Sequence, residues 1–148
     1  MPDALIIDAC RTPRGIGKQG KGALAHLHPQ HLGRTVLEAL VERNGFDTAD
    51  VDDVVWGTSS QVCEQSGDLG RMAALDADYD VRASGMTLDR FCGSGITASN
   101  IGANAIIGAG LVSFLQSALS TYTKAWLLYF GLFFIVMILF APGGIASL

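Results

Sequence analysis

Apolar runs and helical spacings alternate along the first 110 residues of the chain. A continuous apolar run predicts a buried strand over residues 4–9, and two further strands are predicted over residues 54–56 and 86–91. Apolar residues at helical spacing predict three helices, over residues 31–44, 68–77 and about 96–109. Because strands and helices alternate, the order predicts an α/β fold with mostly parallel strand pairing.

The predicted helix over 31–44 has the clearest pattern. Its apolar stripe is expected to consist of Leu32, Val36 and Leu40, with Leu37 and Val41 beside it. Pro29 stands near its start and Asn44-Gly45 at its end, which is typical of helix boundaries. Asp47 then predicts the N-cap of a turn or short helix.

The end of the chain has a different pattern. Residues 126–140 read WLLYFGLFFIVMILF and are apolar on every face, unlike the amphipathic helix of a soluble domain. A helix over about 125–141 would span roughly 25 Å, slightly less than a hydrocarbon core of about 30 Å. Trp126 and Tyr129 suit the membrane interface, and Lys124 suits a cytoplasmic flank. We expect membrane anchoring by residues 125–141; a buried core helix is the alternative.

Charge divides the chain in the same way. The net charge is −4, from 14 acidic and 10 basic residues, and this balance argues against nucleic-acid binding. Every acidic residue lies at or before Asp89, and after Arg90 the one formal charge is Lys124. We therefore expect two parts, 1–110 and 111–148. No signal peptide is evident at the start, so we expect the first part to be soluble and cytoplasmic, with reduced cysteines.

Candidate chemistry centres on Cys92. The three cysteines, Cys10, Cys63 and Cys92, are too widely spaced for a zinc site and suggest no disulfide framework. Cys92 follows the predicted strand over 86–91 and precedes Gly93-Ser94-Gly95 and a helix. Unpaired N–H groups and the helix dipole at that position stabilise a thiolate, which favours a cysteine nucleophile. Inert packing as a small apolar residue is the alternative.

Other motifs carry weaker signals. Residues 15–20 match GxGxxG, but they do not join a strand to a helix, so a loop is expected rather than a nucleotide site. Cys10 is expected to pack inertly and Cys63 to be exposed. We predict no metal site and no cofactor, because neither the histidines nor the acidic residues have a suitable ligand pattern. The histidines are His26, His28 and His31, and the acidic residues are Asp76, Asp78 and Asp80.

Two stretches in particular make residues 1–110 resemble the N-terminal part of a thiolase, an acetyl-CoA acetyltransferase or 3-ketoacyl-CoA thiolase. Residues 7–13 read IDACRTP and residues 86–95 read MTLDRFCGSG, which resembles the family's active-site cysteine signature. The resemblance implies a partial thiolase-type domain, acyl-CoA substrates, a homo-oligomer and Cys92 as the acyl-accepting residue. Asp89 stands where the family usually has asparagine.

The family's other catalytic segments have no counterpart in this sequence. Thiolases carry a Gly-His-Pro segment and a late Cys-x-Gly segment in their second half, whereas here no histidine follows His31 and no cysteine follows Cys92. The resemblance implies acyl transfer from an acyl-CoA to Cys92, followed by Claisen condensation or thiolysis. We predict that this truncated chain alone does not complete that cycle.

The tail has a separate resemblance. Residues 111–148 look like the end of a branched-chain amino-acid ABC transporter permease, so the two resemblances meet near Gly110 and Leu111. A gene fusion or an assembly join is the simplest hypothesis. Two other functions stay open: a membrane or transport component whose soluble part is a passenger, and a thiol-dependent binding module without turnover.

Overall fold

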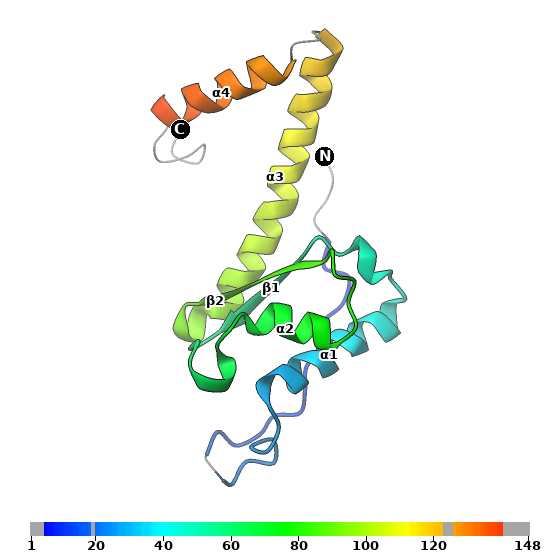
Figure 1. Cartoon of the computed structure of the whole chain (residues 1–148), viewed down its shortest axis with the longest axis vertical. Helices are drawn as coiled ribbons and strands as arrows, with labels where there is room; N and C mark the ends of the chain where they lie inside the picture. Colours follow the sequence, from blue (N-terminus) through cyan, green and yellow to red (C-terminus); the bar gives the residue numbers. More distant parts are fainter. Residues whose placement is uncertain (1–4, 19, 123–125, 141–148) are drawn as a thin grey trace. The chain divides into compact units, whose positions relative to one another are not determined.

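The computed structural model describes residues 5–18, 20–122 and 126–140 of the chain (Figure 1). The chain divides into two compact units between residues 104 and 105. The first unit holds a small sheet with its helices and contains Cys92. The second unit holds the distal half of one long helix and a further apolar helix.

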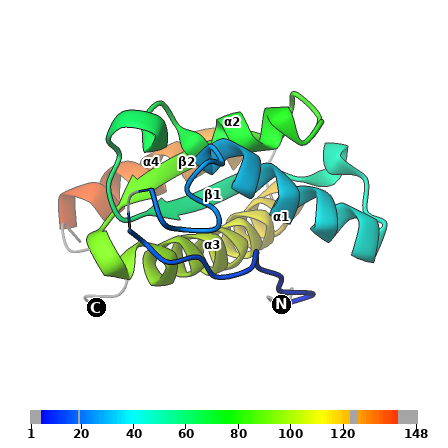
Figure 2. The ribbon, with the colours of Figure 1, turned by 90° about the horizontal axis from the view of Figure 1, so that it is seen from below.

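The sheet of the first unit has two parallel strands within the described residues, β1 (Asp53–Thr58) and β2 (Ser84–Asp89). Their register pairs Thr58 with Asp89, so both strands end at the same edge. Figure 2 shows the sheet between α1 and α2 on one side and the start of α3 on the other. The predicted parallel α/β arrangement is therefore confirmed, although β2 begins and ends two residues before the predicted strand over 86–91.

Helix α1 (Pro29–Asn44) begins two residues before the predicted start. His28 caps it and Gly45 ends it in the left-handed conformation, with φ of 65°. Its most buried residues are Gly33 and Leu37, so the predicted stripe of Leu32, Val36 and Leu40 was displaced by one position. The physical reason is close packing: a Cβ added at Gly33 would lie 2.8 Å from the Ala73 Cβ and 3.1 Å from the Trp56 ring.

The shorter helices follow the predictions more closely. Helix α2 (Leu69–Asp76) connects the two strands, and the Asp68 carboxylate caps it through the Arg71 amide. The 3-10 helix η1 (Thr48–Asp50) is capped by Asp47, whose Oδ1 accepts from the Ala49 amide at 2.9 Å. A further 3-10 turn, η2 (Cys63–Gln65), follows β1.

The core of the first unit is small. Its buried residues are mostly alanines, joined by a few larger side chains: Leu37, Val54, Ala73, Ala74, Ala77, Tyr79 and Ala83. Val41 and Val51 pack against them. The Tyr79 hydroxyl donates to the Leu37 carbonyl at 3.2 Å, and burial raises the pKa of Tyr79.

The strand predicted over residues 4–9 was wrong for the described part of that segment. Residues 5–10 have no regular secondary structure, and Leu5, Ile6 and Ile7 are 77%, 94% and 84% exposed. A buried strand needs a neighbouring strand and two covered faces, and within the described residues the sheet ends at β1. Asp8 instead ties the segment to the end of α1 through Arg43 at 2.8 Å and Asn44 at 3.0 Å.

Two long helices complete the chain. Helix α3 (Ser94–Tyr122) continues well past the predicted end near 109, since no proline interrupts it. Helix α4 (Trp126–Phe140) lies within the predicted range 125–141, whose two end residues fall outside the described residues. Among the described helices, the stretch Phe91–Ala118 is long and apolar enough to cross a membrane. This stretch is not the predicted anchor over 125–141, whose membrane insertion stays a prediction.

Candidate functional site

Cys92 lies in a single 3-10 turn, η3 (Phe91–Gly93), between the end of β2 and the start of α3. Its side chain is exposed and its thiol is free. The sequence predicted a strand, Cys92 and a helix in that order, and the structure has this order with the added turn. The catalytic role of Cys92 stays a prediction.

The carboxylate of Asp89 holds the turn from the strand side. Its Oδ1 accepts from the Phe91 amide at 3.1 Å, and its Oδ2 accepts from the Gln61 amide at 3.2 Å. The Gln61 side chain also donates to the Thr87 carbonyl at 3.2 Å. Asp89 therefore joins the Cys92 turn to the loop after β1, and it uses both carboxylate oxygens to do so.

Ser94 holds the turn from the helix side and is 3% exposed. Its hydroxyl donates toward the carbonyl oxygens of Thr58 and Phe91, at 2.6 and 2.7 Å, and accepts from the Arg90 amide at 2.8 Å. Helix α3 starts directly against β1, since a Cβ at Gly57 would lie 2.6 Å from the Ser94 carbonyl group. A side chain at position 57 would therefore displace the helix that carries the Cys92 turn.

Phe91, next to Cys92, has φ of 48°, in the left-handed region that non-glycine residues seldom adopt. Its side chain is 78% exposed. Backbone strain of this kind occurs where the surrounding contacts over-determine the chain, and Asp89 and Ser94 provide such contacts here. This strain was not predictable from the sequence, because phenylalanine does not mark a left-handed position.

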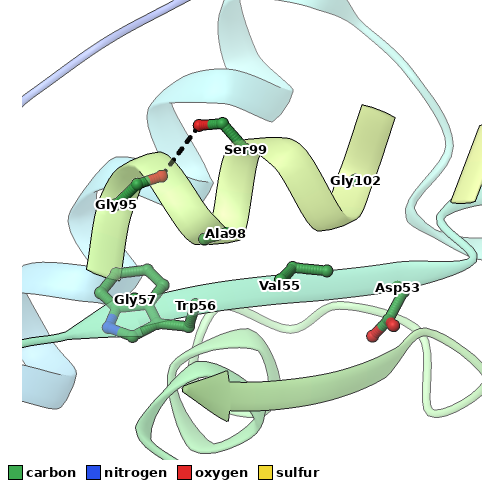
Figure 3. Close-up of a pocket in the computed structure, with 8 residues that line it drawn as sticks. All are labelled: Asp53, Val55, Trp56, Gly57, Gly95, Ala98, Ser99 and Gly102. Atoms are coloured by element: carbon green, nitrogen blue, oxygen red, sulfur yellow. Dashed lines mark hydrogen bonds between the residues drawn. The ribbon is translucent and has the colours of Figure 1, made fainter. Parts of the chain in front are cut away.

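A shallow groove of about 490 Å³ lies between β1 and the first turns of α3 (Figure 3). Small residues of α3 line one side and β1 lines the other: Gly95, Ala98, Ser99, Gly102, Asp53, Val55, Trp56 and Gly57. Cys92 is not among the lining residues. The groove follows from the tight contact at Gly57. Sequence reasoning missed this contact, because predicting it requires knowing that α3 packs on β1.

The other two cysteines lie elsewhere. Cys10 is half-buried and its Sγ donates to the Val36 carbonyl at 3.5 Å. Cys63 is exposed, as predicted, and lies in η2 with φ of 50°. In the described part of the chain, no hydrogen bond joins either thiol to Cys92.

The weaker motifs have structural explanations. His28 Nδ1 accepts from the Gln30 amide at 3.2 Å and so caps α1. Asp80 pairs with Arg82 at 2.9 Å, and hydrogen bonds from Arg82 lower the pKa of Asp80. Within the described ranges, no three His, Cys, Asp or Glu side chains gather as a metal site would require. The described residues of the 15–20 motif lie in a loop and turn.

Comparison with known proteins identifies the family. The thiolase N-terminal domain model matches residues 4–113. A steroid 3-ketoacyl-CoA thiolase of Mycobacterium tuberculosis is 42% identical over 107 residues, which cover 72% of this chain and 26% of that protein. A 3-ketoacyl-CoA thiolase of Psychrobacter sp. is 36% identical over 105 residues, covering 71% and 26%. One of Yersinia pestis is 37% identical over 108 residues, covering 72% and 27%.

The chain thus spans about a quarter of the length of these relatives. The matched region includes both strands and the Cys92 turn, which accounts for the parallel α/β arrangement of the first unit. The chain belongs to the thiolase family, through residues that correspond to part of its N-terminal domain.

Proposed function

We propose that Cys92 accepts an acyl group from an acyl-CoA thioester. The observation that carries the proposal is an exposed thiol at a strand–helix junction of a thiolase N-terminal domain, on a turn held by Asp89 and Ser94. The Cys92 thiolate would attack the thioester carbonyl carbon. A new carbon–sulfur bond then forms while the bond to CoA breaks, and CoA leaves as a thiolate that takes a proton from solvent.

The proposal for this chain is limited to that first half-reaction. Claisen condensation or thiolysis also needs a base to move a proton at the second substrate. No histidine follows His31 and no cysteine follows Cys92 in this sequence, and among the described residues no hydrogen bond joins Cys10 or Cys63 to Cys92. We therefore expect acylation without turnover.

The test is intact-protein and peptide mass spectrometry after incubation of the full chain with acetyl-CoA. We expect one acetyl group per chain, on the peptide that contains Cys92, and no product beyond this single burst. Cys92→Ser should remove the label. Cys63→Ser is the matched control, because Cys63 is also an exposed thiol in a 3-10 turn, and it should keep the label. Acetylation mainly at Cys63, or equal labelling at both thiols, would overturn the proposal.

We also propose that α4 anchors the chain to a membrane. Its sequence is apolar on every face, and large side chains such as Leu127, Leu139 and Phe140 are 69%, 70% and 81% exposed. A helix without a polar face is stable when lipid surrounds it. Resistance of the full chain to alkaline carbonate extraction would test this, and Leu132→Arg should make the chain extractable.

A transport role through the permease-like tail would make a further demand. Residues 111–148 fused to an unrelated soluble protein should then suffice to co-purify permease subunits. Anchoring without such co-purification would leave acyl transfer as the function of the first unit and membrane attachment as that of the tail.

A further inference from the structure

The two exposed thiols of the chain, Cys63 and Cys92, lie in turns that leave the same edge of the sheet. Cys63 is in η2, which follows β1, and Cys92 is in η3, which follows β2. The strands are parallel neighbours, and their last residues, Thr58 and Asp89, are paired in register. Because neighbouring strands lie about 4.8 Å apart, the two turns begin close together.

The first group that both turns share is the carboxylate of Asp89. Gln61, two residues before Cys63, donates its amide to Oδ2 at 3.2 Å. Phe91, directly before Cys92, donates its amide to Oδ1 at 3.1 Å. One side chain therefore holds the backbone just before each cysteine.

The second shared group is Thr58, which is 6% exposed. Its hydroxyl donates to Oε1 of Gln65, two residues after Cys63, at 2.7 Å. Its carbonyl accepts from the hydroxyl of Ser94, two residues after Cys92, at 2.6 Å. Each cysteine is thus flanked by contacts to the same pair of groups, the carboxylate before it and Thr58 after it. These contacts place the two turns side by side.

We propose that Cys63 is the resolving thiol of Cys92, and that a hydroperoxide joins the two in an intramolecular disulfide. The Cys92 thiolate attacks a peroxide oxygen, the O–O bond breaks, hydroxide leaves, and a sulfenic acid forms. The Cys63 thiolate then attacks that sulfur, the S–S bond forms and a second hydroxide leaves. The two protons lost by the thiols convert the hydroxides to water. The thiols lose two electrons, and the peroxide gains them.

The third thiol is placed differently. Cys10 is half-buried, and its Sγ donates to the Val36 carbonyl of α1 rather than lying in a turn at the sheet edge. A disulfide needs Cα atoms roughly 4.4–6.8 Å apart, so its partners come from adjoining segments. Cys63 meets this condition through the shared contacts of the two turns.

The disulfide would regulate the proposed acyl acceptor. It occupies the Cys92 sulfur, so it blocks acylation, and it diverts the sulfenic acid from irreversible oxidation to sulfinic acid. The inference therefore rests on the proposed function for its consequence, whereas formation of the disulfide itself needs no acyl-CoA.

The experiment treats the reduced full chain with hydrogen peroxide, blocks the remaining thiols with iodoacetamide, and maps peptides by mass spectrometry without reduction. We expect one cross-linked pair of peptides, containing Cys63 and Cys92, and a monomer on a non-reducing gel. Dithiothreitol should separate the pair. Cys10→Ser is the matched control and should keep the cross-link.

The variant Cys63→Ser tests the resolving role. After peroxide, labelling of Cys92 by acetyl-CoA should fall by about tenfold or more in the unchanged chain and recover with dithiothreitol. In Cys63→Ser it should not recover, and Cys92 should carry sulfinic or sulfonic acid.

Three results would overturn the inference: pairing of Cys92 with Cys10, a link between two chains, or equal overoxidation of Cys92 with and without Cys63. If the reduced chain is acetylated but forms no cross-link, the inference alone fails. If the cross-link forms in a chain that acetyl-CoA does not label, the proposed function alone fails.

Discussion

At the scale of single residues, Asp89 has the most specific position, because its two oxygens accept the backbone amides of Phe91, in the Cys92 turn, and Gln61, in the loop after β1. Asparagine has one acceptor oxygen, so Asp89→Asn should lose one of these bonds at a cost of about 0.5–1.5 kcal/mol. The substitution also removes a negative charge near Cys92. We expect Cys92 to react roughly twofold to fivefold faster with anionic iodoacetate, and to change less with neutral iodoacetamide.

Peptide mass spectrometry separates the Cys92 adduct from those of Cys10 and Cys63. Asp80→Asn is the control, because Asp80 precedes β2 and Asp89 ends it. Equal acceleration with the two reagents would mean that the substitution exposes the thiol rather than changing its electrostatic surroundings.

At the scale of elements, the contact between α1, α2 and β1 depends on Gly33. Alanine there would gain up to about 1 kcal/mol of helix propensity. Its Cβ would nevertheless lie 2.8 Å from the Ala73 Cβ, and α2 would have to move. We expect Gly33→Ala to destabilise the first unit by about 1–3 kcal/mol, measured by urea unfolding with far-ultraviolet circular dichroism.

Gly102→Ala is the matched control for this experiment. Gly102 is also helical, but a Cβ added there meets no atom within 4 Å. That variant should be neutral or stabilised by up to about 1 kcal/mol. Similar effects of the two substitutions would contradict the close packing at Gly33.

At the scale of the whole molecule, the first unit buries little apolar surface. Its core is made largely of alanines, and Leu5, Ile6 and Ile7 are exposed. We expect residues 1–110 produced alone to bind the dye ANS and to elute as aggregates in size-exclusion chromatography with light scattering. Ile6→Lys should reduce the aggregate fraction at least twofold. A monomer with a cooperative thermal transition would contradict this expectation.

Sequence reasoning was most accurate where local chemistry determines structure. Asp47 caps a short helix through its own side chain, as predicted, and Gly45 ends α1 in a conformation that glycine adopts readily. The position of Cys92 between a strand and a helix was predictable for the same reason. These features depend on neighbours within a few residues.

Features that depend on distant partners were not predictable. The apolar run at residues 5–9 has the composition of a buried strand, but a strand also needs a paired neighbour, which composition does not reveal. The buried side of α1 is set by Ala73 and Trp56 rather than by the most apolar spacing. The left-handed Phe91 and the second contact of Asp89, with Gln61, likewise result from tertiary packing.

The single hydroxyl of Ser94 has a consequence for how the Cys92 turn moves. It contacts the Thr58 carbonyl, the Phe91 carbonyl and the Arg90 amide, so an opening of the turn that moves Ser94 also disturbs the contact with the end of β1. The Arg90 amide hydrogen, which donates to this hydroxyl, should exchange with solvent through such openings. Hydrogen exchange at one backbone position would thus record how often the cysteine leaves its held conformation.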